Sequence, residues 1–129
     1  MKFFCPKCWK EIEEECKTCP HCGYEISKYG LLSYEDKLIH SLNHPIDEFK
    51  INAIRILGNI GGEKAISAFE KLIDIESSVP ILLEVIESLR KLSFNFESAY
   101  SVLKKLTKHK AKVVRESAIS AIREIEVHN

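Results

Sequence analysis

The residues best suited to chemistry are five cysteines, all of which lie between positions 5 and 22. Four of them form two Cys-x-x-Cys pairs with ten residues between the pairs. A zinc ion takes four ligands in a tetrahedron, and thiolates are among the ligands that it prefers. Four protein ligands close the coordination sphere, so we expect no metal-based catalysis. The spacing therefore predicts one structural zinc ion per chain, bound by Cys5, Cys8, Cys19 and Cys22.

The residues around the two pairs also suit metal-binding turns. Proline follows the first cysteine of each pair, where its fixed φ favours a turn. Gly23 follows the second pair, where it can adopt a positive φ, whereas Trp9 stands at this place after the first pair. Residues 1–29 are too few to bury the apolar surface that folding alone requires. Zinc in small fingers supplies about 10–16 kcal/mol of apparent binding energy, which offsets the cost of ordering such a chain.

The cysteines also allow a second set of ligands, namely Cys5, Cys8, Cys16 and Cys19. We reject this set because the turn that ends at Gly23 has the better chemistry. Cys16 is then a spare thiol, and the alternative is that it exchanges with Cys19 as a ligand. His21 lies inside that turn and is expected to face solvent. Short alternation of polar and apolar residues over 10–15 and 24–26 predicts β-hairpin strands around the metal.

A redox function is a rival interpretation of the segment Cys19–Cys22. A Cys-Pro-His-Cys sequence also occurs in thioredoxin-like oxidoreductases, where the start of a helix packed on a sheet lowers the pKa of one thiol. Here only 18 residues precede the pair, and Gly23 follows it at once. No βαβ unit is available to position the pair, so we do not expect redox activity.

The bulk composition is that of a globular protein, with 45% hydrophobic and 29% charged residues. Basic and acidic side chains number 19 each, so the molecule has no net charge to attract nucleic acid or an anionic membrane. No stretch reaches the roughly 20 apolar residues of a membrane helix. The N-terminus also lacks the apolar region of a secretory signal. We therefore expect a cytoplasmic protein, in which thiols stay reduced and cysteine pairs more often bind metal than form disulfides.

The composition changes near Ser33, from a segment with all the cysteines to one rich in Leu, Ile, Ala, Glu and Lys. This change predicts two units, residues 1–29 and residues 33–129, joined by the short segment 27–30. Because the link is too short to be a flexible tether, the units are expected to touch. The residues expected to pack the first unit against the second are Trp9, Tyr24 and Tyr29.

A pattern with a period of 32 and then 33 residues runs through the second unit. Small or β-branched residues recur at Ala53, Val85 and Ala118, and large apolar residues recur one, four and seven places later. This spacing is helical, and another amphipathic stretch precedes each block, so each repeat is a pair of helices. We predict a mainly α fold, an α-solenoid of about six helices with a small N-terminal β unit. The three predicted pairs are residues 34–61, 62–93 and 95–127.

Residues near the predicted helix ends suggest caps. Ser78 and Asn95 are expected to cap the fourth and fifth helices, with Pro80 in the first turn of the fourth. Gly58, Gly61 and Gly62 lie near the end of the second helix, where a glycine can adopt the left-handed cap conformation.

Both units resemble known families. Residues 3–26 resemble a zinc ribbon of the two-knuckle type, through the segments Cys5–Cys8 and Cys19–Gly23. The stretch 47–61, which continues to Leu72, resembles a HEAT repeat and is closest to the short HEAT-like kind also found in phycobilin lyases.

Two further segments bear on the HEAT resemblance. Val114, Arg115 and Ala118 match the corresponding helix in the third repeat. The first and second repeats have Lys50 and Leu82 where the family usually has arginine, so the Asp–Arg contacts between HEAT repeats are not expected to be complete.

The resemblance implies a function in protein binding. HEAT stacks typically hold another protein on the concave face that is lined by the second helix of each pair. We therefore predict a non-catalytic zinc-binding adaptor or scaffold with an unidentified protein partner and no small-molecule substrate. Its candidate contact residues are Arg55, Glu87 and Ser120. The sequence shows no phosphate-binding loop or nucleophile motif, and we expect scattered surface positions for His40, His44, His109 and His128.

Two alternative functions remain. Zinc ribbons often serve transcription or translation, and a basic patch near the C-terminus could bind a nucleic-acid backbone. That patch comprises Lys104, Lys105, Lys108, Lys110, Lys112 and Arg115. The zero net charge and the lack of interleaved aromatic residues count against it. The second alternative is a bilin lyase-like enzyme, for which fold-level likeness is the only support.

Overall fold

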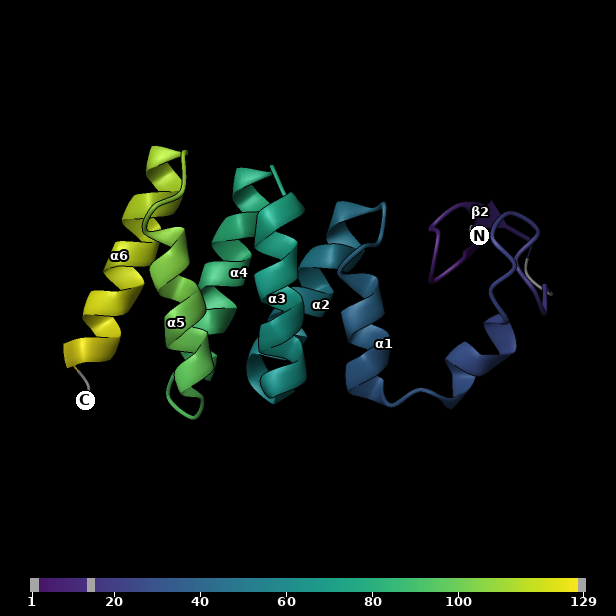
Figure 1. Ribbon diagram of the computed structural model, residues 1–129, viewed down its shortest axis with the longest axis horizontal. Helices are drawn as coiled ribbons and strands as arrows, with labels where there is room; N and C mark the ends of the chain where they lie inside the picture. The colour runs from purple at the N-terminus through teal and green to yellow at the C-terminus, as the bar shows by residue number, and fades with distance from the viewer. Residues whose placement is uncertain (1–2, 14–15, 128–129) are drawn as a thin grey trace.

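The computed structural model describes residues 3–13 and 16–127 (Figure 1). The chain starts with two short antiparallel strands, β1 (Phe3–Phe4) and β2 (Glu11–Ile12). A 3-10 helix, Ile26–Leu31, leads from this ribbon to the helical part. The α-helices that follow are α1 (Tyr34–Ser41), α2 (Asp47–Ile60), α3 (Glu63–Ile75), α4 (Val79–Leu92), α5 (Glu97–Leu106) and α6 (Lys112–Val127).

The predicted fold class, mainly helical with a small N-terminal β unit, is confirmed. The predicted strand at 24–26 is reduced to an isolated bridge between Thr18 and Glu25. Residues 14 and 15 of the other predicted strand, and His128, lie outside the described residues.

The helices form two layers (Figure 1). In one layer α4 packs between α2 and α6, and in the other α3 packs between α1 and α5. The ribbon lies beside α1, at the end of the stack opposite α6 (Figure 1). Within the described chain, none of the helices combines the length and the apolarity that crossing a bilayer requires.

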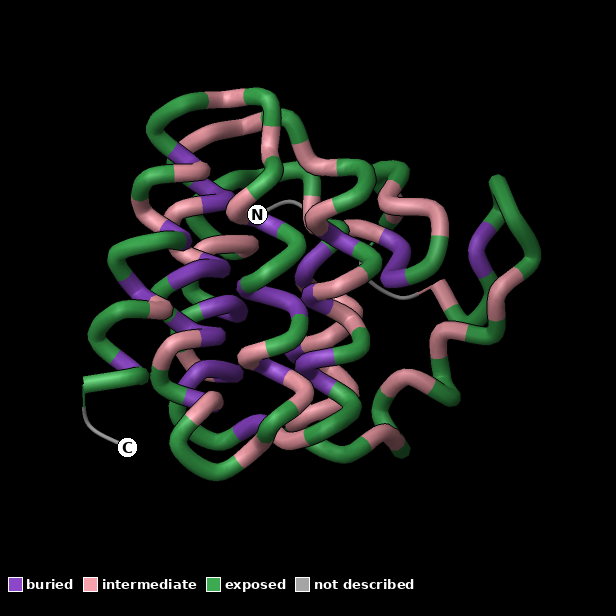
Figure 2. Tube along the Cα trace, turned by 60° about the vertical axis from the view of Figure 1, so that its left-hand side comes forward, coloured by how far each residue is buried: buried purple, intermediate pink, exposed green. Residues whose placement is uncertain are grey.

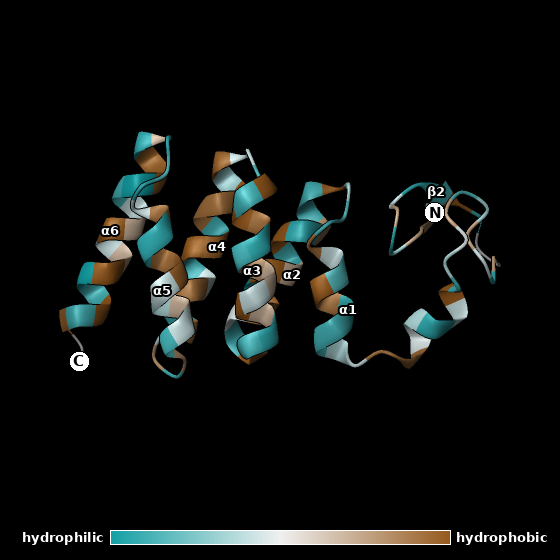
Figure 3. Cartoon of the chain, in the orientation of Figure 1, coloured by the Kyte–Doolittle hydropathy of each residue, from teal (hydrophilic) through white to brown (hydrophobic). Residues whose placement is uncertain are grey.

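One hydrophobic core runs through the stack, from Leu38 in α1 to Ile125 in α6. The repeat column Ala53, Val85 and Ala118 is buried in all three repeats. Hydrophobic and hydrophilic residues alternate around each helix, and the buried positions recur along the helices (Figures 2 and 3). The core includes none of the described ribbon residues, so the stack has its own source of stability.

The repeat pattern fails at the far end of the stack. Ile54 and Ile86 are buried, but the corresponding Ile119 in α6 is 37% exposed, and Val113 in the same helix is 55% exposed. In the described chain α6 is the last helix of its layer, so no further helix covers these side chains. Apolar spacing thus predicts burial only where a neighbouring helix exists.

The predicted left-handed glycine cap is wrong. Among the described glycines only Gly23, in the ribbon, has a positive φ. Gly61 caps α2 with an extended conformation, and Gly58 lies inside α2. Both positions require glycine because of close contacts: a Cβ on Gly61 would lie 2.5 Å from the Leu57 carbonyl oxygen.

The caps predicted for the fourth and fifth helices are also wrong in detail. The N-cap residue of α5 is Phe96 and not Asn95. Ser78 does stand at the N-cap of α4, with Pro80 in the first turn, but its side chain makes no capping hydrogen bond. The Glu76 carboxylate accepts hydrogen bonds from the backbone N–H groups of Ser77 and Ser78, in the turn that leads into α4.

Glu76 also joins two repeats, since Lys50 of α2 donates to it at 2.9 Å and both side chains are largely buried. Burial opposes ionisation of Glu76, but Lys50 and the N–H groups of Ser78 and Ser77 outweigh it and lower the pKa of Glu76 below 4.5. A lowered pKa in the folded state stabilises the protein above the unfolded-state pKa, and this contribution is lost as the pH falls through the folded-state pKa.

Glu76→Gln is therefore expected to reduce the free energy of unfolding by about 1–2 kcal/mol at pH 7. The difference from the unaltered protein should narrow as the pH falls below about 4.5, because Glu76 then becomes neutral as well. Urea unfolding of both proteins at several pH values measures this difference in the free energy of unfolding. Glu116→Gln is the control, because Glu116 forms only an exposed pair with Lys112 at 3.8 Å. A difference that stays constant with pH would contradict the assignment.

The ribbon contacts the first helix pair through two histidines. His40 in α1 donates from Nδ1 to the Pro6 carbonyl oxygen at 3.0 Å, and its ring meets that of Tyr29 edge to face. His44 lies among three aromatic rings: its ring centroid is 5.0 Å from that of Trp9, 5.3 Å from Phe4 and 4.7 Å from Phe49.

These contacts place Trp9 and Tyr29 where the sequence predicted, between the ribbon and the helices. Tyr24 takes part in none of the ring contacts among the described residues. Burial, together with the positive charge of Lys50, lowers the pKa of His44, so its ring is neutral at pH 7 and suits an aromatic cluster. Two of the histidines predicted to be scattered on the surface thus serve as docking residues.

Candidate metal centre

The first cysteine pair lies in a tight turn between β1 and β2. The Trp9 N–H donates to the Cys5 carbonyl oxygen at 2.9 Å, and the Cys5 N–H donates to the Lys10 carbonyl oxygen at 3.0 Å. These bonds close the turn and aim the Lys7 N–H at the Cys5 sulfur, 3.4 Å away. An N–H group pointing at a sulfur stabilises its thiolate form.

The second pair repeats the same arrangement. The Gly23 N–H donates to the Cys19 carbonyl oxygen at 2.9 Å, and the Cys19 N–H donates to the Tyr24 carbonyl oxygen at 2.9 Å. The His21 N–H lies 3.4 Å from the Cys19 sulfur, as the Lys7 N–H does from that of Cys5. The two turns therefore present their sulfurs in equivalent ways.

Trp9 and Gly23 occupy equivalent places and share a left-handed backbone, with φ of 61° and 79°. Glycine adopts this conformation freely, whereas a residue with a Cβ pays about 1–2 kcal/mol. Trp9 is the only non-glycine residue with a positive φ in the described chain. Its ring contacts His44, so the strained position has a packing role that glycine could not fill.

The four sulfurs converge on one point. All four ligand atoms lie within 4.8 Å of one another, with Cys5 and Cys22 separated by 3.6 Å and Cys8 and Cys19 by 3.7 Å. In a tetrahedron with zinc–sulfur bonds of about 2.3 Å, the sulfurs lie about 3.8 Å apart. The cysteines thus fit a metal ion with tetrahedral thiolate coordination, and they are the four that the sequence spacing selected.

The thiols of this cluster have divergent pKa values. Burial opposes ionisation of Cys19, but the N–H groups of His21 and Cys22 outweigh it and lower its pKa to about 6. At Cys22 the Tyr24 N–H favours the thiolate, yet burial and the sulfurs of Cys5, Cys19 and Cys8 raise the pKa to about 11. Four negative charges at this spacing repel one another, and a divalent cation removes that repulsion.

The side chains of Cys16 and His21, also singled out from the sequence, are not part of this cluster. Cys16 lines an apolar hollow of about 580 Å³ between the ribbon and the start of α2, together with Trp9 and Phe49. His21 is exposed, as the sequence predicted. Neither residue belongs to the group of metal-binding side chains found among the described residues.

Substitution of Trp9 separates its two roles. Trp9→Gly is expected to retain metal binding, since glycine suits the left-handed turn, but to lower the melting temperature of the helices because the ring contact with His44 is lost. Trp9→Ala should be less stable than Trp9→Gly by about 1 kcal/mol, because alanine keeps the backbone strain. Thermal melts followed by circular dichroism at 222 nm, with zinc content measured in parallel, provide the comparison. A melt of Trp9→Gly identical to that of the unaltered protein would contradict the docking role.

The predicted basic patch is only partly assembled. Lys104, Lys105 and Lys108 surround a shallow hollow of about 390 Å³ at the end of α5. Lys105 pairs with Glu70 of α3, and the Lys104 ammonium lies over the Tyr100 ring at 4.6 Å.

The remaining basic residues make other contacts. Arg115 donates to the backbone carbonyl oxygens of His109 and Lys110, which closes the turn between α5 and α6. Lys112 lies 3.8 Å from Glu116 on its own helix. Lys110 and Lys112 are exposed but do not line the hollow at the end of α5.

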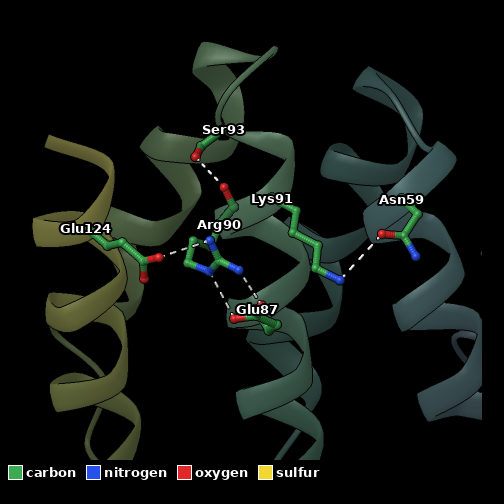
Figure 4. Close-up of polar contacts among 6 residues, drawn as sticks. All are labelled: Asn59, Glu87, Arg90, Lys91, Ser93 and Glu124. Atoms are coloured by element: carbon green, nitrogen blue, oxygen red, sulfur yellow. Dashed lines mark hydrogen bonds and ion pairs between the residues drawn. The ribbon is translucent and has the colours of Figure 1, made fainter. Parts of the chain in front are cut away.

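The layer of α2, α4 and α6 carries a network of polar contacts that sequence reasoning missed. Arg55 of α2 donates to Glu84 of α4. Arg90 contacts both Glu87 on its own helix and Glu124 on α6 (Figure 4). Lys91 reaches back to Asn59 of α2 (Figure 4). Of the candidate contact residues, Arg55 and Glu87 belong to this network, whereas Ser120 is exposed outside it. The sequence does contain a signal for these contacts, because Arg55 and Arg90 each have a glutamate about one repeat further along the chain.

The comparisons with known proteins agree with this architecture. No curated protein and no solved structure matches the chain significantly. The family profile described as HEAT repeats matches residues 35–123, which is more than half of the chain and spans α1 to most of α6. The chain therefore belongs to the HEAT repeat family.

Proposed function

We propose that this protein is a non-catalytic adaptor, in which a zinc-bound ribbon is fixed to the first helix pair of a HEAT stack and the stack binds another protein. The observation that carries the metal assignment is the separation of the four sulfurs, which suits four zinc–thiolate bonds. We propose zinc as the ion because four thiolates in a closed tetrahedron form a common structural zinc site, and the reducing cytoplasm that we propose as its location keeps the thiols free to bind it.

The α2–α4–α6 face supports the binding role. It presents charged side chains of both signs on rigid helices, including Arg55, Glu84, Arg90 and Glu124. Mixed charges favour a protein surface with complementary charges over a uniformly anionic nucleic-acid backbone. Because each of these charges already has a partner on the chain, the face is pre-organised and loses little side-chain entropy on binding.

The histidines support a function without catalysis. His40 and His44 fix the ribbon to the helices. His109 accepts a hydrogen bond at Nδ1 from the Ala111 N–H, which shapes the turn before α6. Each of these three rings has a structural contact that explains its position.

Metal analysis and partner capture test the two halves of the proposal. Elemental analysis of the purified protein should give one zinc per chain, and replacement by cobalt should give the intense visible bands of tetrahedral thiolate coordination. An affinity capture from the native cells should enrich a protein with the unaltered chain and lose it with the double variant Arg55→Glu and Arg90→Glu. Lys17→Glu in the ribbon is the control for a change of charge. A protein retained equally by the double variant would contradict binding through the α2–α4–α6 face.

A further inference from the structure

A second surface lies on the other layer, between α1 and α3. A hollow of about 430 Å³ opens there, with apolar side chains along its floor and two lysines of α3 at its edge. We name it the α1–α3 groove and define it by Ile39, Leu42, Lys71, Leu72 and Ile75.

The groove exists because the two helices differ in length. α1 has 8 residues and α3 has 13, so at 1.5 Å per residue α3 is about 8 Å longer. The first turns are joined: Glu35 accepts a hydrogen bond from the Gly62 N–H at 3.0 Å, and Asp36 pairs with Lys64 at 3.5 Å. The last turn of α3 therefore extends beyond α1, and its Ile75 is 74% exposed.

The next interhelical groove in the same layer is closed by polar contacts. Between α3 and α5, Ser98 donates to Glu63 at 2.7 Å and Lys105 pairs with Glu70. The hollow there is smaller, about 250 Å³, and its lining includes both glutamates. Each of these α5 side chains thus reaches an acidic residue on the preceding helix of its layer.

Lys71 in α3 corresponds to Lys105 in α5, since the buried Leu72 and Leu106 follow them in the two helices. The neighbour of α3 in the same layer, α1, places no glutamate in the groove beside Lys71: the groove residues of α1 and its C-terminal turn are Ile39, Leu42 and Asn43. None of the ion pairs among residues 3–13 and 16–127 includes Lys71. The repeat thus leaves a lysine, beside exposed apolar surface, without the acidic partner that its counterpart has.

We propose that the α1–α3 groove binds an acidic, apolar segment of a partner protein, which places apolar side chains against Ile39, Leu72 and Ile75 and a carboxylate on Lys71. This inference rests on the proposed function in protein binding and adds a second contact surface to the α2–α4–α6 face. The carboxylate takes the place that Glu70 has opposite Lys105.

The surrounding charges favour such a segment over a membrane or a nucleic acid. Glu35, Asp36 and Asp74 lie on the same two helices as the groove residues, so the region has no broad positive field. A polyanion would meet these acidic residues along with the lysines. A short segment can place one carboxylate locally while it buries apolar side chains, and the exposed Ile75 offers the surface for that burial.

Selection from a random peptide library displayed on phage, with the full zinc-loaded chain as bait, tests this proposal. The selected peptides are expected to combine Asp or Glu with Leu, Ile or Phe. Binding of a synthetic selected peptide, followed by fluorescence anisotropy, should weaken about tenfold with Lys71→Glu and with Ile75→Asp. Both residues are exposed, so neither change should unfold the stack. Lys108→Glu makes the same charge reversal at the end of α5 and should leave binding unchanged.

The outcomes separate this inference from the proposed function. Peptides whose binding is weakened by Arg55→Glu but not by Lys71→Glu or Ile75→Asp would contradict binding in the groove. They would leave the proposal for the α2–α4–α6 face intact. Enrichment of basic peptides that bind Lys71→Glu as well as the unaltered chain would overturn the groove too. If no peptide is enriched, the α1–α3 groove does not bind such a segment, and the affinity capture decides separately whether the α2–α4–α6 face binds a protein.

Discussion

Replacing Cys19 by serine is expected to abolish metal binding and to unfold the ribbon while the helical stack stays folded. Cys19 is only 2% exposed, and its sulfur lies 3.7 Å from that of Cys8, so serine at this position removes a ligand from inside the cluster. Structural zinc supplies about 10–16 kcal/mol of apparent binding energy in small fingers, and a ribbon of this size has little apolar surface to substitute for it. The stack should remain folded because its core begins at Leu38 and contains no ribbon residue.

Two signals distinguish the units in this experiment. Trp9 is the only tryptophan of the chain and contacts His44, so its emission should shift to the red when the ribbon unfolds. Circular dichroism at 222 nm reports the helices and should keep most of its intensity. The melting temperature of the stack should fall modestly, because the contacts that His40 and His44 make with the ribbon are lost. A parallel loss of helical signal and tryptophan shift would show that the two units fold only together.

Cys16→Ser is the matched control, since it makes the same change at the one cysteine outside the cluster. It should retain one zinc per chain and the tryptophan emission of the unaltered protein. Loss of zinc in this variant would point to the second set of ligands, in which Cys16 replaces Cys22. A chelator added to the unaltered protein should reproduce the Cys19→Ser result.

The sequence predicted the helical stack well because each repeat packs its helices against the neighbouring helices in the same way. A column such as Ala53, Val85 and Ala118 lies where adjacent helices approach, so small or branched apolar residues recur there with the repeat period. The metal cluster could be predicted from the sequence equally well. Each cysteine pair forms one local turn, and only the contact between the two turns depends on tertiary structure.

Features that depend on one particular neighbour could not be predicted in this way. Glu76 holds the turn before α4 and also pairs with Lys50 from another helix, and no local pattern marks that pair. Trp9 in a left-handed turn looked like a departure from the glycine rule until His44 supplied the contact for its ring. The α1–α3 groove likewise follows from the different lengths of two helices and not from either helix alone.

Gly58→Ala is expected to cause a large loss of stability, although it adds only a single methyl group to the stack. Gly58 lies inside α2 where α4 crosses it, and a Cβ there would lie 2.5 Å from the Ser88 Oγ and 2.9 Å from the Ser88 Cα. Real Cβ atoms do not come so close to a backbone atom, so the two helices must move apart. α2 and α4 belong to the layer that runs through the whole stack, and the displacement reaches its core.

The same displacement breaks a buried hydrogen bond. Ser88 is 2% exposed and donates from Oγ to the Ile54 carbonyl oxygen at 2.8 Å. Overpacking costs about 1–3 kcal/mol, and loss of a buried hydrogen bond costs about 1–3 kcal/mol more. Alanine gains back about 1 kcal/mol through its higher helix propensity. The net effect should be near 3 kcal/mol, a large part of the roughly 5–15 kcal/mol that stabilises a domain.

Urea unfolding should show this loss as a lower midpoint, and thermal melts should show a fall of roughly 10 °C for a chain of this size. Gly30→Ala is the control, because a Cβ on Gly30 meets no atom within 4 Å and its φ is not left-handed. Ser88→Gly added to Gly58→Ala should recover part of the lost stability, since it removes the Oγ and Cβ that the new methyl group meets. If the two substitutions are instead additive, the close contact between α2 and α4 is not the cause, because a shared clash makes neighbouring substitutions interact.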